Sequence, residues 1–443
     1  MTMKTIVTFC VVALAAGRAA ANNYYVDPSG ANGAFTSVGA ALAAVPAGTA
    51  ANRSNIYVKP GTYTEKLTVS RAFVSLVGTG ADPKDVVLTY NLNATSDNGA
   101  GGTVGTTGST STTINATDFV AKNLTFANST HDNVAQAVAI KTTRDRAAFE
   151  NCRFWGFQDT LYVTAGRSYF KSCTVTGDTD FIFGNGTAVF DHSTINESST
   201  FGYVTAANTN STTANGLVLI DCTLTGTPNT DVDPLTGTRY SPINSVTNNQ
   251  SFLGRPWQYS ASQPASVTLI NTKIGSFVKT DGWHPWDAGN TDPAATTRSA
   301  EFGSKDLNGN ALSVAGRVAW SHQMTADQAA AYTLEHLFGP ASFWNQQDPG
   351  GANPLNLQPH YTGPYTNEAW GGGNATVAWD PVAALRSVSV PEPGAGGMLL
   401  IGVLAWRRRT TKVLSTQWRH GAETQRGLTQ SRSGAPEGIE LSI

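Results

Sequence analysis

Asn151-Cys152-Arg153-Phe154 and Ser172-Cys173-Thr174-Val175 are two copies of one short pattern, 21 residues apart. In each copy a polar residue is followed by a small residue, a variable one and an apolar one. Further copies occur at steps of 28, 20, 29 and 50 residues, at 123–126 (Asn-Leu-Thr-Phe), 192–195 (His-Ser-Thr-Ile), 221–224 (Asp-Cys-Thr-Leu) and 271–274 (Asn-Thr-Lys-Ile). A repeat of this length, with strands too short to bury a face alone, indicates a solenoid whose coils share one core.

Short β-rich runs such as 55–58, 73–77 and 217–220 extend the repeat in both directions. Amphipathic helical patterns are scarce, and the main ones cover 35–45 and 325–337. We therefore expect an all-β fold, a parallel β-helix with a short N-terminal helical cap and a helix near the C-terminal end. An antiparallel β-sandwich is the alternative, but it does not explain why the small residues keep a constant register.

The composition agrees with an exported scaffold. Only 14% of the residues are charged, and glycine occurs 44 times in 443 residues. Because the repeat is unbroken, we expect one elongated domain over residues 22–346 rather than several. Residues 22–390 contain 20 basic and 27 acidic residues, a net charge of about −7, which disfavours a nucleic-acid partner. An uncharged or esterified substrate fits this charge better than a fully anionic polymer.

The first 21 residues have the order of a signal peptide. Lys4 precedes an apolar run over 6–16, and three alanines at 19–21 provide a cleavage site. The mature chain is therefore expected to be secreted or held at the cell surface. Cys152 and Cys173 would then lie in an oxidising compartment on stacked strands, close enough for a disulfide. A ladder of buried free thiols is the alternative.

The C-terminal part has another composition. Residues 347–389 are rich in Gly and Pro and are expected to form an extension or linker. Residues 390–409 run from Val390-Pro391-Glu392-Pro393 through a short apolar stretch to three arginines. This order resembles the bacterial PEP-CTERM sorting tail, which implies sorting machinery as a partner. Residues 410–443 show no periodic pattern and are expected to be disordered.

Two carboxylates repeat the 21-residue interval. Asp159 lies in Gly-Phe-Gln-Asp-Thr-Leu (156–161) and Asp180 in Asp-Phe-Ile-Phe-Gly (180–184). On adjacent coils they would lie about 5 Å apart. Neighbouring carboxyls in different surroundings can be driven to different protonation states, so that one acts as an acid and the other as a nucleophile or base. The spacing leaves open which acid attacks.

Five local motifs occur in one order, at 61–65 (Gly-Thr-Tyr-Thr-Glu), 136–139 (Gln-Ala-Val-Ala), 156–161, 180–184 and 253–257 (Leu-Gly-Arg-Pro-Trp). Together they resemble the pectin methylesterase (pectinesterase) family, over about residues 24–344. The resemblance implies a right-handed parallel β-helix. It also implies hydrolysis of the C6 methyl esters of galacturonate in pectin, without a metal or an organic cofactor, by a monomer.

The resemblance further implies the roles of five residues. Asp180 is the expected nucleophile, and Asp159 is the expected general acid and then base. Arg255 beside Asp180 would lower the pKa of that carboxyl, whereas Asp159 would be pushed toward its protonated form. The side-chain amides of Gln136 and Gln158 would donate hydrogen bonds to the oxyanion.

The aromatic residues Trp257, Phe181 and Trp283 are expected to contact the substrate. Because Phe181 and Phe183 alternate with Asp180 and Ile182, one aromatic face can line the cleft while the other enters the core. A β-helical pectin lyase and a carbohydrate-binding surface protein without catalysis remain alternatives, since the fold alone does not decide the function. Neither explains two acids, two amides and an arginine together.

Overall fold

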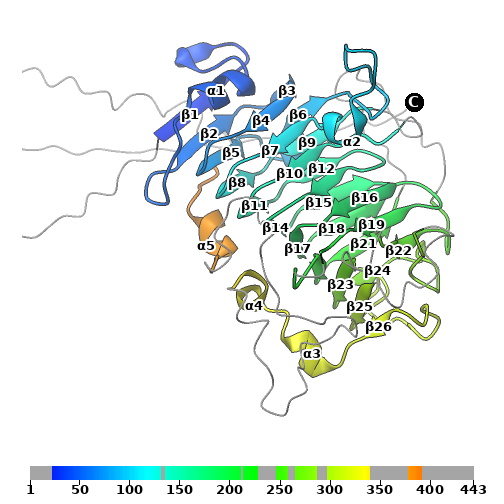
Figure 1. The fold of residues 1–443 in the computed structure, drawn as a ribbon. Coiled ribbons are helices and arrows are strands. Elements are labelled where there is room, and N and C mark those ends of the chain that lie inside the picture. The colour runs from blue at the N-terminus through cyan, green and yellow to red at the C-terminus, as the bar shows by residue number, and fades with distance from the viewer. Residues whose placement is uncertain are drawn as a thin grey trace, which may run out of the picture. The chain divides into compact units, whose positions relative to one another are not determined.

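Three parallel β-sheets wind around one core (Figure 1). The computed structural model describes residues 22–130, 135–210, 213–227, 246–257, 265–286, 297–339 and 378–391. Each coil contributes one strand to sheet 1, then one to sheet 2, then one to sheet 3, and every neighbouring pair of strands is parallel. The predicted right-handed parallel β-helix is confirmed.

Sheet 1 has eleven strands: β1 (Asn22–Val26), β2 (Ser54–Val58), β5 (Val74–Gly78), β8 (Phe119–Lys122), β11 (Ala147–Glu150), β14 (Arg167–Lys171), β17 (Thr187–Asp191), β20 (Leu217–Ile220), β23 (Ser266–Ile270), β25 (Arg298–Phe302) and β26 (His322–Gln323). Sheet 2 has eight: β3 (Gly61–Thr64), β6 (Val86–Tyr90), β9 (Thr125–Asn128), β12 (Arg153–Trp155), β15 (Thr174–Gly177), β18 (Thr194–Glu197), β21 (Thr223–Gly226) and β24 (Lys273–Ile274). Sheet 3 has seven: β4 (Leu67–Val69), β7 (Thr112–Ile114), β10 (Ile140–Thr142), β13 (Leu161–Val163), β16 (Thr179–Gly184), β19 (Tyr203–Ala207) and β22 (Phe252–Gly254).

The coil that carries the two repeated acids is 21 residues long in all three sheets. Ala147 pairs with Ser168 in sheet 1, Arg153 with Thr174 in sheet 2, and Leu161 with Ile182 in sheet 3. The sequence interval is therefore the length of one complete turn of the solenoid. Residues 21 apart in this region occupy equivalent places on successive coils.

The polar residue that opens each repeat segment forms the corner between sheets 1 and 2. All six adopt a left-handed backbone, with φ between 49° and 54°, at Asn123, Asn151, Ser172, His192, Asp221 and Asn271. Short polar side chains tolerate this conformation because they can hydrogen-bond locally. The Asn151 amide also links two coils, since it donates to Oδ1 of Asn123. The first residue of each repeat segment is therefore set by the left-handed backbone at the corner, and the apolar residue by packing in the core.

Stacked phenylalanines fill the interior. Phe149 stacks on Phe170 with ring centroids 4.8 Å apart, and Phe170 stacks on Phe190 at 4.6 Å. These rings come from successive strands of sheet 1 and belong to one buried apolar cluster that runs through the coils. Because equivalent side chains of successive coils stack in the core, each coil is stabilised by its neighbours.

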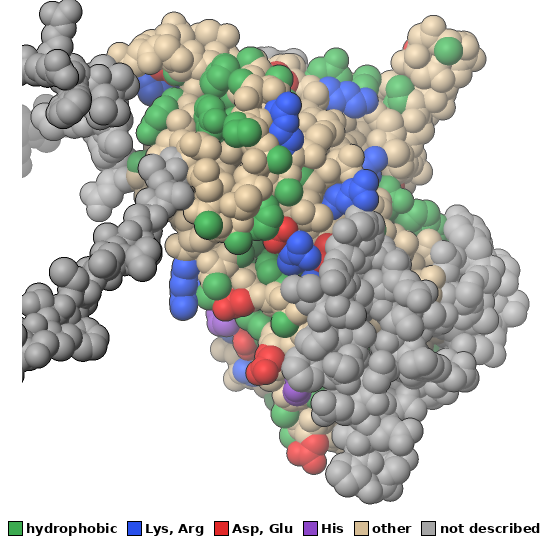
Figure 2. Space-filling view, turned by 60° about the vertical axis from the view of Figure 1, so that its left-hand side comes forward, with side chains coloured by type: hydrophobic (Ala, Val, Ile, Leu, Met, Phe, Trp, Pro, Cys, Tyr) green, Lys and Arg blue, Asp and Glu red, His purple; other side chains and the backbone are tan. Residues whose placement is uncertain are grey.

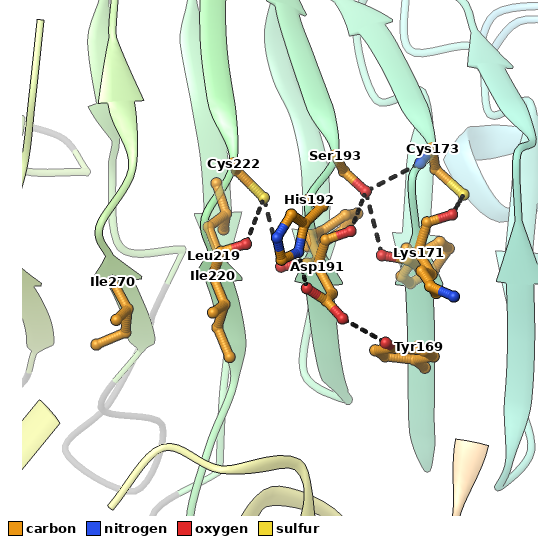
Figure 3. A network of polar contacts seen from close by, with 12 residues as sticks. Tyr169, Lys171, Cys173, Asp191, His192, Ser193, Leu219, Ile220, Cys222 and Ile270 are labelled. Atoms are coloured by element: carbon orange, nitrogen blue, oxygen red, sulfur yellow. Dashed lines mark hydrogen bonds and ion pairs between the residues drawn. The ribbon is translucent and has the colours of Figure 1, made fainter. Parts of the chain in front are cut away.

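Cys152, Cys173 and Cys222 are free and buried, so the structure forms no disulfide between Cys152 and Cys173. Each thiol donates to the carbonyl two residues earlier, at 3.4–3.5 Å. Side chains at equivalent places on parallel coils point the same way, and a bridge would require both to turn toward each other. The structure therefore contains the alternative, a ladder of buried thiols. In Figure 3, Cys173, Ser193 and Cys222 lie on successive strands at this corner.

The helices lie at the ends of the solenoid and on sheet 1. The N-terminal helix α1 (Val38–Ala44) falls within the predicted 35–45, and the Ser37 hydroxyl accepts from the backbone of Ala40. The second predicted helix is two helices, because the chain breaks at residues 331–333. The shorter elements and the C-terminal helices are η1 (Ala31–Gly33), η2 (Pro83–Asp85), α2 (Gly105–Gly108), α3 (Ala326–Ala330), α4 (Leu334–Phe338) and α5 (Pro381–Arg386).

Part of the predicted linker packs against the outer face of sheet 1. Helix α5 lies beside β11 (Figure 1), and Leu385 and Val388 are buried in a cluster with Tyr169 and Phe338. The backbone of Trp379 donates to the carbonyl of Phe338 at 3.1 Å. Residues 378–391 are therefore a packed strap on sheet 1 rather than a simple spacer.

The described surface in Figure 2 is mostly uncharged, and the Lys, Arg, Asp and Glu side chains on this face are scattered. Within the ranges that the structure describes, no helix is long and apolar enough to cross a membrane. The predicted signal peptide (1–21), residues 392–409 of the predicted sorting segment and the predicted disordered tail (410–443) lie outside the described residues.

Candidate active site

The two repeated acids lie where sheet 2 passes into sheet 3. Asp159 precedes β13, and Asp180 is the second residue of β16 on the next coil. The backbone of Asp159 donates to the carbonyl of Thr179 at 3.0 Å. Both acids are almost fully buried, with exposed fractions of 7% and 5%. The predicted juxtaposition on successive coils is present.

A β-bulge sets the direction of Asp180. Thr179 pairs with Tyr203 and Ile182 with Thr205, so β16 contains one residue more than β19 between these pairs. Asp180 is the residue with a left-handed backbone in this interval, with φ 53°. Such bulges re-aim a side chain, and positive φ in a non-glycine residue is often found at functional sites.

Arg255 holds Asp180 with both ends of its guanidinium group. Nε donates to Oδ1 at 2.8 Å and a terminal nitrogen donates to Oδ2 at 2.6 Å. The guanidinium carbon lies 4.1 Å from the centroid of Tyr203 and 4.5 Å from that of Trp286. Two aromatic rings and a bidentate ion pair therefore fix one orientation of the carboxylate.

The surroundings separate the two acids in protonation. Burial raises the pKa of Asp159 well above its usual range, and the negative charge of Asp180 raises it further. Burial also raises the pKa of Asp180, but the hydrogen bonds and charge of Arg255 act in the opposite direction. The expected fall in the pKa of Asp180 is therefore outweighed by burial. Asp159 keeps its proton to higher pH than Asp180.

Gln136 and Gln158 lie on neighbouring coils of the same corner. The backbone of Ala137 donates to the carbonyl of Gln158 at 3.1 Å, so the two glutamines follow each other along the solenoid. Both side chains are half-buried. In the described part of the chain no hydrogen bond is formed by either side-chain amide, which leaves both able to donate to a ligand.

An aromatic wall stands beside the acids on the outer face of sheet 3. Tyr162 stacks on Phe183 with ring centroids 4.1 Å apart, and Trp257 lies 5.9 Å from Phe183. Trp286 follows at 6.4 Å from Trp257. Flat apolar rings next to polar groups suit the apolar face of a sugar.

Two of the three predicted substrate contacts are wrong. Phe181 is fully buried in the main core and Phe183 faces the site instead, because the bulge at Asp180 resets the alternation of the strand. Trp283 is 2% exposed and its ring also belongs to the main core; its backbone forms a parallel bridge with Gly254. Trp257 lies in the aromatic wall, and its contact with the substrate stays a prediction.

Two aromatic residues were missed. Tyr162 lies 21 residues before Phe183, so the coil interval could have identified it. Tyr203, whose ring lies under Arg255, could not be found from the 21-residue interval. The coil from Thr179 to its partner Tyr203 is longer than that interval. Asp178 is buried in the same turn as Asp180 and accepts a hydrogen bond from the backbone of Thr179, so it caps this turn.

A buried acid that keeps its proton beside an acid clamped by arginine suits acyl transfer through a nucleophilic carboxylate. Among the residues that the structure describes, no three His, Cys, Asp or Glu side chains are grouped so as to hold a metal ion. The described constellation therefore consists of acids, amides, one guanidinium group and aromatic rings.

Comparison with known proteins agrees with this geometry. The family model described as Pectinesterase matches residues 25–340. Pectinesterase 31 of Arabidopsis thaliana is 35% identical over 315 residues, which cover 69% of this chain and 89% of that protein. A pectin methylesterase crystallised with a hexasaccharide is 28% identical with a TM-score of 0.58, covering 72% of this chain and 98% of the other. The pectin methylesterase of Erwinia chrysanthemi gives the same values.

Proposed function

The chain belongs to the pectinesterase family, and we propose that it hydrolyses the C6 methyl esters of galacturonate in pectin to free carboxylates and methanol. The observation that carries the proposal is the bidentate Arg255–Asp180 pair on the coil next to Asp159, a buried acid whose pKa is raised. It supplies a fixed carboxylate nucleophile and a proton donor on successive coils.

In the first half of the reaction, Asp180 attacks the ester carbonyl carbon. The carbonyl oxygen becomes an oxyanion, toward which Gln136 and Gln158 would donate hydrogen bonds. As the intermediate collapses, the bond to the methoxy oxygen breaks and Asp159 gives its proton to that oxygen. Methanol leaves, and the substrate acyl group is bound to Asp180 as an anhydride.

In the second half, Asp159 is ionised and acts as a base. It removes a proton from water, whose oxygen attacks the acyl carbon of the anhydride. Collapse of this second intermediate releases the galacturonate carboxyl and the Asp180 carboxylate. Asp159 has regained its proton, so the pair returns to its starting state.

Gln136→Ala and Gln158→Ala should each lower kcat by about a hundred- to a thousandfold, because an oxyanion donor acts in the transition state more than in the ground state. Initial rates of methanol release give kcat and KM for both variants. Gln250→Ala, a change in a half-buried glutamine of another turn, is the matched control. A glutamine variant that raises KM but keeps the wild-type kcat would contradict the oxyanion role.

Arg255→Gln should move the pH profile of kcat/KM to higher pH. The first step needs Asp180 ionised and Asp159 protonated, so the pKa of Asp180 governs the acid limb and that of Asp159 the alkaline limb. Arg255 acts to lower both pKa values, and its loss raises both. The acid limb should move further, because Arg255 hydrogen-bonds Asp180 directly.

Arg146→Gln is the control for this profile, since Arg146 forms its ion pairs with Asp118 and Asp145. Its pH profile should match the wild type. A profile of the Arg255 variant that stays in place or moves to lower pH would show that Arg255 does not control these acids.

Methanol release from highly esterified pectin, measured with a chelator present, tests the proposed activity. Unsaturated uronides as products would indicate a lyase instead. Binding to pectin without either product would indicate a carbohydrate-binding surface protein.

We further propose that residues 1–21 direct export and are removed, and that the enzyme works as a monomer outside the cell or at its surface. The PEP-CTERM-like order of residues 390–409 supports handling by sorting machinery. Mass spectrometry of the exported protein would show whether residues 1–21 are removed and whether the chain is also cut within 390–409.

A further inference from the structure

Phe201 combines exposure with an unfavourable backbone. Its side chain is 66% exposed, more than any other large hydrophobic residue in the described part of the chain. Its φ is 65°, a left-handed conformation that bulky side chains rarely adopt. Exposure and strain would both be relieved by a small polar residue. A phenylalanine here is therefore costly for the fold and suggests a role in binding.

The loop that carries Phe201 is hydrogen-bonded to the next coil. The backbone of Gly202 donates to the Ser251 hydroxyl at 3.1 Å, and the backbone of Phe252 donates to the carbonyl of Gly202 at 3.0 Å. A Cβ on Gly202 would lie 2.3 Å from both the Asp178 carbonyl oxygen and a carboxyl oxygen of Glu197. Glu197 is fully buried and accepts from the backbone of Ser199. These contacts fix the backbone on both sides of the exposed ring.

This loop belongs to the coil that follows the one carrying Asp180, and it lies at the same corner between sheets 2 and 3. The backbone of Tyr203 donates to the carbonyl of Asp178 at 3.0 Å, and Tyr203 pairs with Thr179. The Tyr203 ring in turn lies under Arg255, which holds Asp180. Phe201 lies on the coil next to the nucleophile, offset from Asp180 by one inter-strand spacing along the solenoid and by about three residues along the chain. A polymer that runs along the solenoid would place a neighbouring sugar unit on this side of the reacting one.

The loop itself is uncharged, with acids behind it and a cation, the ammonium of Lys279, over the Phe252 ring of the next coil. Residues 198–202 read Ser-Ser-Thr-Phe-Gly and carry no charge. The guanidinium of Arg255 is already paired with Asp180, and Asp178 adds a further acid behind the loop. A free galacturonate would therefore bring a second anion next to acids, whereas a methyl ester would bring an apolar group next to a ring.

We propose that Phe201 is a specificity-determining platform for the galacturonate unit adjoining the reacting ester, and that it favours a neighbour that is itself methyl-esterified. This inference rests on the proposed pectin methylesterase activity. It adds a preference for the methylation pattern to that activity. The platform acts in binding and takes no part in bond breaking.

Phe201→Ala should raise KM on highly esterified pectin about two- to tenfold and leave kcat within about twofold. KM on pectin that has been partly de-esterified with base should change less. Phe201→Arg should lower KM on the de-esterified pectin relative to the esterified one, because it adds a cation for the free carboxylates. Methanol release by the wild type is measured first on both substrates.

Phe201→Asn separates binding from folding, because asparagine tolerates a left-handed backbone. It should bind like Phe201→Ala while unfolding at or above the wild-type temperature. Leu307→Ala, at another exposed hydrophobic position, is the control and should keep both KM values. If Phe201→Ala and Phe201→Arg keep the wild-type KM on both pectins while methanol is still released, the platform is refuted. Failure of the wild type to release methanol would instead refute the proposed function.

Discussion

Asp180→Asn and Asp159→Asn should each lower kcat for methanol release from pectin by at least about a thousandfold. An amide at position 180 cannot form the anhydride, and an amide at 159 cannot give a proton to methoxide or take one from water. The bulged backbone and the aromatic wall would remain, so the substrate should still bind, although an asparagine side chain at position 180 could accept only one of the two Arg255 hydrogen bonds. Initial rates and pectin binding by the same preparations separate the two effects.

The Asp159→Asn substitution should not weaken the fold. The pKa of Asp159 is higher in the folded protein than in the unfolded chain, so its ionisation opposes folding as the pH rises above the unfolded value. A neutral amide removes this effect. The Asp159→Asn variant should therefore unfold at a temperature equal to or above that of the wild type, with a gap that widens from pH 4 to pH 7.

Asp178→Asn is the matched control, because Asp178 is a buried acid of the same turn and takes no part in the proposed bond-making and bond-breaking steps. Its kcat should fall far less than that of the two other variants. Substantial turnover by Asp180→Asn or by Asp159→Asn would overturn the assignment of nucleophile and acid.

Ending the chain after residue 346 should destabilise the protein strongly, whereas ending it after residue 391 should not. The shorter chain loses Leu385 and Val388, each of which is buried on sheet 1. Burial of one such side chain contributes about 1.5–3 kcal/mol, so the pair contributes about 3–6 kcal/mol. Total stabilities of about 5–15 kcal/mol make this a large fraction. Thermal unfolding of the two truncated chains measures the difference.

Point variants test the strap without removing any chain. Leu385→Ala should lower the unfolding temperature, and Arg386→Ala, at the exposed neighbouring position, should leave it unchanged. Equal unfolding temperatures for the chains ending at 346 and 391 would show that the strap contributes nothing. The family match ends at residue 340, so a stabilising strap would be an addition to the shared domain.

The solenoid and the placement of the catalytic pair were predictable because both depend on one local property, the number of residues in a coil. The interval between Cys152 and Cys173 is the interval between Asp159 and Asp180, and both equal the pairing offset of β13 on β16. Residues that share a repeat position must meet on adjacent coils. No long-range information was needed for that conclusion.

The side chains that line the site were less predictable. Simple alternation along 180–184 does not distinguish Phe181 from Phe183, and the answer depends on one extra residue opposite β19. Trp283 was expected to contact the substrate, but its ring fills the core. Cysteines at equivalent positions suggested a bridge, although parallel stacking keeps the thiols side by side and reduced.

Repetition along the chain was therefore sufficient for the β-helix, its coil length and the meeting of Asp159 with Asp180. Only the tertiary structure decided what surrounds them. The Arg255–Asp180 pair joins residues 75 positions apart, and the strap at 378–391 returns to strands more than two hundred residues earlier. Such contacts depend on loop paths, bulges and the packing of distant surfaces, and these leave no periodic trace in the sequence.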